Sequence, residues 1–339
     1  MKQLVLTSPG DLSWHDAAEP SLPSAAYALV RPVAAATCDF DHLVVAGRMP
    51  LPMPIAIGHE LVGEVVEVGG EVTGVQPGDV VAMPFQIACG TCGNCRRGLT
   101  TACEQVPWLS CYGLGALSGD WGGAVSDLVA VPWADAVLHR LPDNVRPEDA
   151  AAASCNIPDA YRAVAPQLGE RPDARVFVTG GAFANISHYT VAIAKALGAD
   201  VVDYYSPDAE QSAKAERLGA RVLASPTEVE AEAYEITVDN SQDPDLFALA
   251  VRATAPAGTL TATTMYPDAR TPVPLMDMFA RAITFRTGQP HAGALLGDVL
   301  SLLADGRLDS AAVTTAVVPW DDAPEAWRAG SGKHVCVRH

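Results

Sequence analysis

The sequence lacks any apolar run that approaches the roughly 18 residues a membrane-spanning helix needs. The N-terminal MKQLVLTSPG has an apolar stretch too short for a secretory signal and meets Pro9 at once. Basic residues are scarce: 22 Lys and Arg face 40 Asp and Glu, and the formal net charge of −18 argues against nucleic acid or an anionic membrane as a partner. We therefore expect a soluble, cytoplasmic protein.

Internal repeats and long low-complexity tracts are also missing, and 49% of the residues are hydrophobic, enough for about two packed domains. Residues 1–155 contain short Val- and Ile-rich runs broken by Gly, Pro and Asp, which predicts a β-rich domain. In residues 156–290, apolar strands alternate with helical stretches, which predicts a parallel sheet wrapped by helices. We expect an α/β protein in which residues 291–339 return to the first domain.

Eight cysteines are present, but the chain is too long and signal-free for a secreted disulfide scaffold. Four of them crowd into CGTCGNCRRGLTTAC with the spacing C-x2-C-x2-C-x7-C: Cys89, Cys92, Cys95 and Cys103. Four thiolates can surround one Zn²⁺ at about 2.3 Å and leave no open position, so residues 89–103, the zinc lobe, predict a structural zinc site. A redox C-x-x-C pair or free thiols are the alternatives.

A second set of candidate ligands is spread more widely: Cys38 in ATCDFDH, His59 and Glu60 in IGHELVGEV, and Cys155 in ASCNIPDAY. Taken singly, such a cysteine is usually a small buried hydrophobe and such a histidine an ordinary hydrogen-bonding residue. These residues occur together with the zinc lobe, the GHE at 58–60, the glycine and valine run that ends in GD at 78–79, and the WGGAVSD at 121–127. In these residues and motifs together, the chain resembles the zinc-dependent medium-chain dehydrogenases/reductases, the alcohol dehydrogenase-like superfamily. The resemblance extends from about residue 20 to the end.

This resemblance implies a GroES-like β-rich catalytic domain joined to a Rossmann domain with a doubly wound parallel sheet. It also implies that Cys38, His59 and Cys155 bind a catalytic zinc, with the fourth position left for water, Glu60 or a substrate oxygen. Such an open site can polarise a carbonyl or lower the pKa of an alcohol. Asp41, three residues after Cys38, would accept the second ring proton of His59 and fix its tautomer, or would be an ordinary turn residue.

The hydroxyl that usually starts the proton relay is missing. Two positions after the first zinc ligand, where these enzymes carry Ser or Thr, the sequence has Phe40, which cannot pass a proton. His42, Asp159 or an ordered water can provide another route. Alternatively, Phe40 lines an apolar substrate pocket, to which we expect Trp108 and Tyr112 to contribute.

The loop TGGAFANISHYT, residues 179–190, stands between an apolar strand and a helix, as a dinucleotide-binding turn does. It has fewer glycines than such a turn usually contains. Gly180 and Gly181 are enough for a tight turn. Ala182 and Ser187 take the places of the glycines that admit the pyrophosphate and let the helix pack closely, with Ala184 a further candidate for such a place. We expect a weakened grip on the cofactor.

The carboxylate that usually hydrogen-bonds the ribose of NAD is missing as well, because Ser206 occupies the position of that Asp or Glu. Asp208 could act as a displaced ribose ligand. NADP is poorly supported, since Asp208 and Glu210 stand beside a single nearby cation, Lys214.

Two functions therefore stay open. We expect a zinc-dependent oxidoreductase that interconverts an alcohol and an aldehyde or ketone with NAD(P), favours NAD, binds two zinc ions per chain and assembles as a homodimer or homotetramer. The alternative is a non-redox zinc Lewis-acid enzyme, a lyase, isomerase or cyclase, on the same fold with a degraded nucleotide site.

Overall fold

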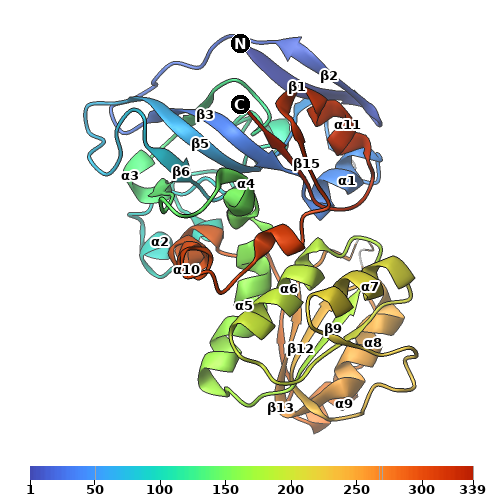
Figure 1. Cartoon of the computed structure of the whole chain (residues 1–339). Helices are drawn as coiled ribbons and strands as arrows, with labels where there is room; N and C mark the ends of the chain where they lie inside the picture. The colour runs from blue at the N-terminus through green and yellow to red at the C-terminus, as the bar shows by residue number, and fades with distance from the viewer. Residues whose placement is uncertain (50, 267, 269, 339) are drawn as a thin grey trace. The chain divides into compact units, whose positions relative to one another are not determined.

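The computed structural model describes residues 1–49, 51–266, 268 and 270–338, and the chain divides into two compact units (Figure 1). Unit 1 comprises Met1–Pro158, Pro290–Gly306 and Thr314–His339, and unit 2 comprises Asp159–Gln289 and Arg307–Val313. From the sequence, we expect domain borders after residues 155 and 290. One short segment differs: Arg307–Val313, expected in the first domain, belongs to unit 2.

Unit 1 is built on a seven-stranded sheet of order β15-β16-β3-β5-β6-β8, with β7 paired to β3, and on a small sheet of order β2-β1-β4. Its strands are β1 (Lys2–Ser8), β2 (Asp11–Asp16), β3 (Ala28–Ala36), β4 (Ile55–Ala56), β5 (Glu60–Val68), β6 (Val80–Ala82), β7 (Val129–Val131), β8 (His139–Arg140), β15 (Ala316–Pro319) and β16 (His334–Val337). Fully buried side chains such as Val30 of β3 and Val65 of β5 belong to one hydrophobic core cluster of this unit, and each contributes about 1.5–3 kcal/mol by burial.

Short helices connect these strands. They are α1 (Asp39–Val45), α2 (Gly93–Arg96), α3 (Ala134–Val137), α4 (Pro147–Ala150), α10 (Ala292–Ala304) and α11 (Ala323–Arg328), with single 3₁₀ turns at η1 (Thr100–Ala102), η2 (Gly115–Ser118), η3 (Ala151–Ser154) and η5 (Trp320–Asp322). None of the helices in the described part of the chain is long and apolar enough to cross a bilayer.

Strand pairing in unit 1 joins segments that lie far apart in the sequence. Antiparallel pairing of β3 with β5 sets Ala36 opposite Glu60, so the chain leaving β3 and the chain entering β5 lie side by side. Antiparallel pairing of β16 with β3 sets Val335 opposite the same Ala36. The C-terminal segment thereby reaches the residues that follow β3.

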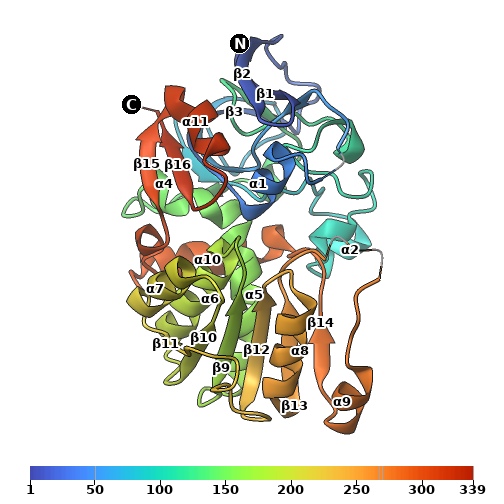
Figure 2. The same cartoon turned by 90° about the vertical axis from the view of Figure 1, so that its right-hand side faces the viewer.

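Unit 2 contains a six-stranded parallel sheet of order β11-β10-β9-β12-β13-β14 (Figure 2). The strands are β9 (Val176–Gly180), β10 (Val202–Tyr205), β11 (Arg221–Val222), β12 (Tyr234–Asn240), β13 (Thr254–Ala262) and β14 (Thr284–Arg286). The helices are α5 (Asn156–Glu170), which begins in unit 1, α6 (Asn185–Ala196), α7 (Ala209–Arg217), α8 (Pro244–Ala253) and α9 (Leu275–Ala280), with a 3₁₀ turn at η4 (Ser310–Ala312). The order reverses between β9 and β12, as in a doubly wound Rossmann sheet.

The turn after β9 owes its two glycines to close packing. Neither Gly180 nor Gly181 has a positive φ. A Cβ at Gly180 would overlap the hydroxyl of the buried Tyr204, and a Cβ at Gly181 would overlap the backbone carbonyl of Ser241. The neighbouring strands β10 and β12 therefore approach this turn too closely for any side chain.

Replacing Gly180 with alanine should lower the free energy of unfolding by about 1–3 kcal/mol, because the new methyl group has no space beside Tyr204. The matched control is Gly169→Ala in α5, where a Cβ would meet no atom within 4 Å. That change should be neutral or stabilising, since alanine is the better helix former. Urea denaturation followed by circular dichroism compares the two variants, and equal midpoints would show that Tyr204 moves aside at no cost.

Candidate zinc centres

The four cysteines of the zinc lobe converge, with all their Sγ atoms within 4.8 Å of one another. The backbone supplies N–H donors to these sulfurs: Thr91 N–H and Cys92 N–H donate to Cys89 Sγ at 3.4 and 3.3 Å, and Cys95 N–H donates to Cys92 Sγ at 3.4 Å. Cys92 is also the N-cap of α2. Donors aimed at sulfur favour the thiolate, which is the form that binds metal.

The charge balance of the lobe fits a bound cation. Backbone N–H groups of Glu104 and Cys95 lower the pKa of Cys92 to about 6. Burial and the neighbouring Cys92 raise the pKa of Cys95 to about 12. Four thiolates this close repel one another unless a cation compensates them, and zinc accepts four sulfur ligands.

A second cluster joins Cys38, His59 and Cys155, whose ligand atoms also lie within 4.8 Å of one another. Cys38 is the N-cap of α1, just after β3, and His59 directly precedes β5, so the β3–β5 pairing brings these two together. Cys155 follows η3. The hydroxyl of Ser154 fixes this turn to β5, because it accepts from Leu61 N–H at 3.0 Å and donates to Leu61 C=O at 3.1 Å.

Asp41 orients two members of this cluster. One carboxylate oxygen lies 3.2 Å from His59 Nδ1, and the other accepts from Cys38 N–H at 3.0 Å and from Trp327 Nε1 at 3.1 Å. Burial alone would lower the pKa of His59, but the charges of Asp41 and Cys38 raise it well above its usual value. The same buried negative charge would attract a metal cation, so the donor set fits zinc.

Glu60 is not among the ligand atoms that converge in the described residues. Its Oε1 accepts from Asn156 N–H at 2.8 Å, and its Oε2 forms an ion pair with Lys333. Both charged side chains are fully buried. Sequence analysis missed Asn156 and Lys333. The sequence signal for this ion pair is weak: Lys333 lies near the apolar run VCV, and its partner Glu60 is 273 residues away.

Phe40 forms part of an apolar wall at this cluster. It is half-buried and packs against a group of buried residues that includes Cys38 and Cys155. Its ring centroid lies 6.5 Å from that of His59, and the ring of Phe85 approaches His59 from another direction at 5.7 Å. These contacts favour the pocket-lining interpretation of Phe40.

The other two aromatic residues expected in the pocket are elsewhere, so this prediction was wrong. Trp108 is 79% exposed, in a turn beyond the zinc lobe. Tyr112 is buried in a separate core cluster, where its hydroxyl donates to Ala130 C=O at 3.1 Å. Leu114 and Cys111, which the sequence did not single out, pack in the same cluster as Cys38 and Cys155 instead.

The two side chains suggested for a proton relay have structural partners. His42 is buried, and its Nε2 lies 3.0 Å from Gly332 C=O. Asp159 belongs to unit 2 and accepts from Arg162 Nε at 2.6 Å. The relay route stays a prediction.

The small residues of the Rossmann turn differ in their surroundings. Ala182 is exposed, whereas Ala184 is buried at the N-cap of α6. Ser187 is buried in the first turn of α6, and its hydroxyl donates to Ala184 C=O at 2.8 Å. Ser187 Oγ also lies 3.3 Å from the Tyr204 hydroxyl that covers Gly180.

The residues after β10 form a helix cap. Ser206 Oγ accepts from Asp208 N–H at 3.1 Å. Asp208 is the N-cap of α7, with Oδ1 accepting from Glu210 N–H at 2.9 Å and from Gln211 N–H at 3.2 Å. The structure thus gives Asp208 a local role that the sequence analysis did not anticipate, and its contact with a ribose stays a prediction.

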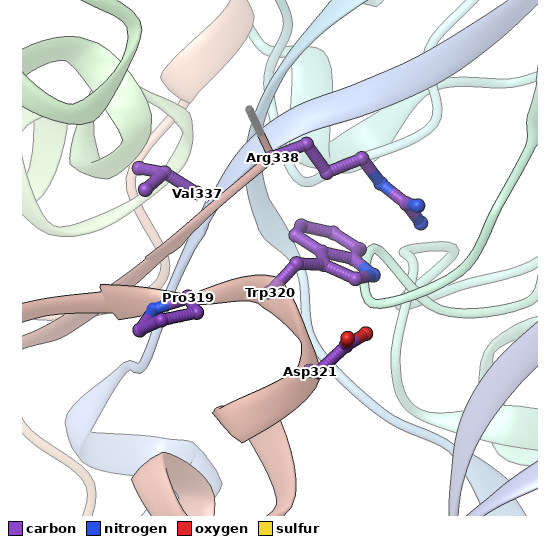
Figure 3. A pocket seen from close by; sticks show the side chains of 5 residues that line it. All are labelled: Pro319, Trp320, Asp321, Val337 and Arg338. Carbon is purple, nitrogen blue, oxygen red and sulfur yellow. The ribbon is translucent and has the colours of Figure 1, made fainter.

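A separate hollow of about 270 Å³ lies in unit 1 between η5 and the end of β16 (Figure 3). Its walls are Pro319, Trp320, Asp321, Val337 and Arg338, with the Arg338 guanidinium 4.1 Å from the centre of the Trp320 ring. None of these residues belongs to either cysteine cluster.

The chain is similar to known dehydrogenases in sequence and in fold. The model of the alcohol dehydrogenase GroES-like domain matches residues 24–143. Over 100% of the chain, the sequence is 27% identical to a "probable zinc-binding alcohol dehydrogenase" of Mycobacterium tuberculosis, 88% of which is covered. Over 57% of the chain, it is 31% identical to a glutathione-independent formaldehyde dehydrogenase of Pseudomonas aeruginosa, and this match spans about half (49%) of that protein.

A solved structure, an alcohol dehydrogenase from Thermus sp. ATN1, is 28% identical with a TM-score of 0.90 and 100% of both chains covered. These relatives are all named as dehydrogenases, and they give no support to the non-redox alternative. The chain contains an alcohol dehydrogenase GroES-like domain, resembles zinc-dependent alcohol dehydrogenases along its whole length, and is an oxidoreductase of the alcohol dehydrogenase type.

Proposed function

We propose that this enzyme interconverts an alcohol and an aldehyde or ketone at a zinc ion held by Cys38, His59 and Cys155, with NAD as the preferred hydride carrier. The observation that carries the proposal is the convergence of these three ligand atoms within 4.8 Å, beside an apolar wall. Three ligands leave a tetrahedral metal one position for substrate, as catalytic zinc sites require.

The chain's own residues have distinct tasks in this reaction. When bound, zinc would supply a Lewis acid for the C–O bond, while the nicotinamide exchanges hydride with the carbon. Asp41 holds His59 through Nδ1, so Nε2 faces the other two ligands. Phe40 and Phe85 exclude water from the ring of His59, which strengthens electrostatic interactions at the site.

We infer a second, structural zinc in the zinc lobe. The support is a closed set of four sulfurs and the backbone N–H groups around them. Such a site leaves no position for substrate, and its metal contributes directly to folding free energy.

Zinc analysis should therefore find about two ions per chain. Cys155→Ala should lower this to about one and abolish NAD-dependent alcohol oxidation, while the circular dichroism spectrum stays unchanged. Cys95→Ser should instead destabilise the folded protein, because it removes a ligand from the closed site. The control is Cys336→Ala, which alters a buried cysteine outside both clusters and should keep both ions. One zinc or none in the wild-type protein would refute the assignment, as would full activity of Cys155→Ala.

The preference for NAD rests on charges at the start of α7. Asp208 and the exposed Glu210 would repel the 2′-phosphate of NADP, and Lys214 donates its Nζ to Val313 C=O at 2.5 Å. We expect NAD to bind about fivefold more tightly than NADP, which corresponds to about 1 kcal/mol. Calorimetric titration with both nucleotides measures this ratio, and Glu210→Lys should reduce it. Tighter binding of NADP to the wild-type protein would contradict the assignment of the ribose position.

The expected homo-oligomer has a candidate surface in unit 2. Among the described strands, β14 pairs with β13 alone, so one of its edges offers unpaired backbone groups. Nearby α9 exposes Leu275, Met276 and Phe279 by 68%, 75% and 84%. Exposed apolar side chains beside an open strand edge favour pairing with a second copy of the chain.

Phe279→Glu should convert the assembly to monomers, because a charge at this surface cannot be buried unpaired against a second copy. Sedimentation equilibrium gives the mass. Val317→Glu, at a 51% exposed apolar position in unit 1, is the matched control and should leave the mass unchanged. An oligomer that survives Phe279→Glu would show that the chains meet through another surface.

A further inference from the structure

The side chain of Asn156 connects a zinc ligand to a buried ion pair. Its Nδ2 donates to Cys38 Sγ at 3.1 Å, and its Oδ1 accepts from Lys333 Nζ at 2.8 Å. Its backbone N–H, in the first turn of α5, donates to Glu60 Oε1 at 2.8 Å. Asn156 is fully buried, so water does not compete for these bonds.

The orientation of this amide is determined by Lys333. An ammonium group can only donate hydrogen bonds, so it must face the amide oxygen, and the NH₂ group must then face the sulfur. The opposite orientation would place NH₂ against NH₃⁺. The three protons of Lys333 have three acceptors: Asn156 Oδ1, Glu60 Oε2 and, at 2.7 Å, Thr37 C=O.

The same network holds Glu60. One of its carboxylate oxygens is bound by the N–H at the start of α5, where the helix dipole favours negative charge, and the other is bound by Lys333. To reach a metal at Cys38, His59 and Cys155, Glu60 would have to break at least one of two buried charge-assisted bonds.

We propose that Asn156 is a positioning residue for the catalytic zinc site: its amide, aligned by Lys333, orients Cys38 and withdraws electron density from its sulfur, while Lys333 keeps Glu60 off the metal. This inference rests on the proposed zinc site but not on the proposed reaction. A hydrogen bond to a thiolate reduces the charge that the sulfur donates, so the metal becomes the stronger Lewis acid. The three ligands alone, two cysteines and one histidine, do not provide this increase in the Lewis acidity of the metal.

The test uses the full-length protein with cobalt in place of the catalytic zinc, because thiolate-to-cobalt charge-transfer bands report on sulfur donation. Asn156→Leu, which has a similar volume but no donor, should shift these bands to longer wavelength, because the sulfur then donates more charge. It should also weaken cobalt binding about tenfold to a hundredfold in a chelator competition, because Cys38 loses the contact that orients it. The matched control is Asn144→Leu, an exposed amide of unit 1 whose side chain donates to Ala304 C=O at 2.7 Å. It should change neither quantity.

A second pair of variants tests Lys333. Lys333→Met should free Glu60 to join the metal, which the cobalt d–d bands report as a higher coordination number. Adding Glu60→Gln should restore the wild-type d–d pattern, since it removes the carboxylate and also the unpaired buried charge that could prevent Lys333→Met from folding. Both Lys333→Met and the double variant should also shift the charge-transfer bands to longer wavelength, because the amide of Asn156 lacks its orienting cation in each.

These measurements need neither substrate nor nucleotide, so they separate this inference from the proposed reaction. Identical charge-transfer bands and cobalt affinities in Asn156→Leu and Asn144→Leu would refute the positioning role even in an active enzyme. A wild-type protein that binds no cobalt at Cys38, His59 and Cys155 would refute the zinc site and this inference together.

Discussion

The buried ion pair of Glu60 and Lys333 connects the segments that form the candidate zinc site. Removing two charges from water costs several kcal/mol for each, so such a pair persists only when the remaining hydrogen-bonding groups are also satisfied. Here Asn156 and the carbonyl of Thr37 complete the set. Thr37 directly adjoins Cys38, Asn156 adjoins Cys155, and Glu60 itself adjoins His59. The requirement to satisfy two buried charges therefore also constrains the segments that carry the proposed zinc ligands.

In the turn after β9, side chains occupy positions where a dinucleotide-binding loop usually has glycine. Ser187 stands where a glycine would normally let the helix pack, and its hydroxyl is satisfied within the first turn of α6. Tyr204 fills the space above Gly180, and Asp208 caps α7. The departures at Ser187 and Ser206 thus have local structural roles in the fold, which account for these residues without a loss of redox function.

Much of this arrangement was predictable from local sequence patterns. The apolar run YEITVDN predicts a strand, and β12 covers that run. The cysteine spacing of the zinc lobe predicts convergence because its ligands lie within one short segment. Trp108 and Tyr112 were misplaced because an aromatic residue near a site in the sequence can equally face solvent or a different core. Asn156 and Lys333 were missed because their roles depend on strand pairing between distant segments, which leaves no local signal.

The antiparallel pairing of β16 with β3 has a consequence for the order in which the protein is made. Lys333 leaves the ribosome 177 residues after Asn156, and Cys38 and Glu60 are synthesised earlier still. Until that strand docks, the carboxylate of Glu60 has no cation, the amide of Asn156 has no fixed orientation, and long-range pairing of this kind is slow to form. The docking of β16 thus completes the contacts that hold Glu60 and Asn156 in place beside the candidate metal ligands.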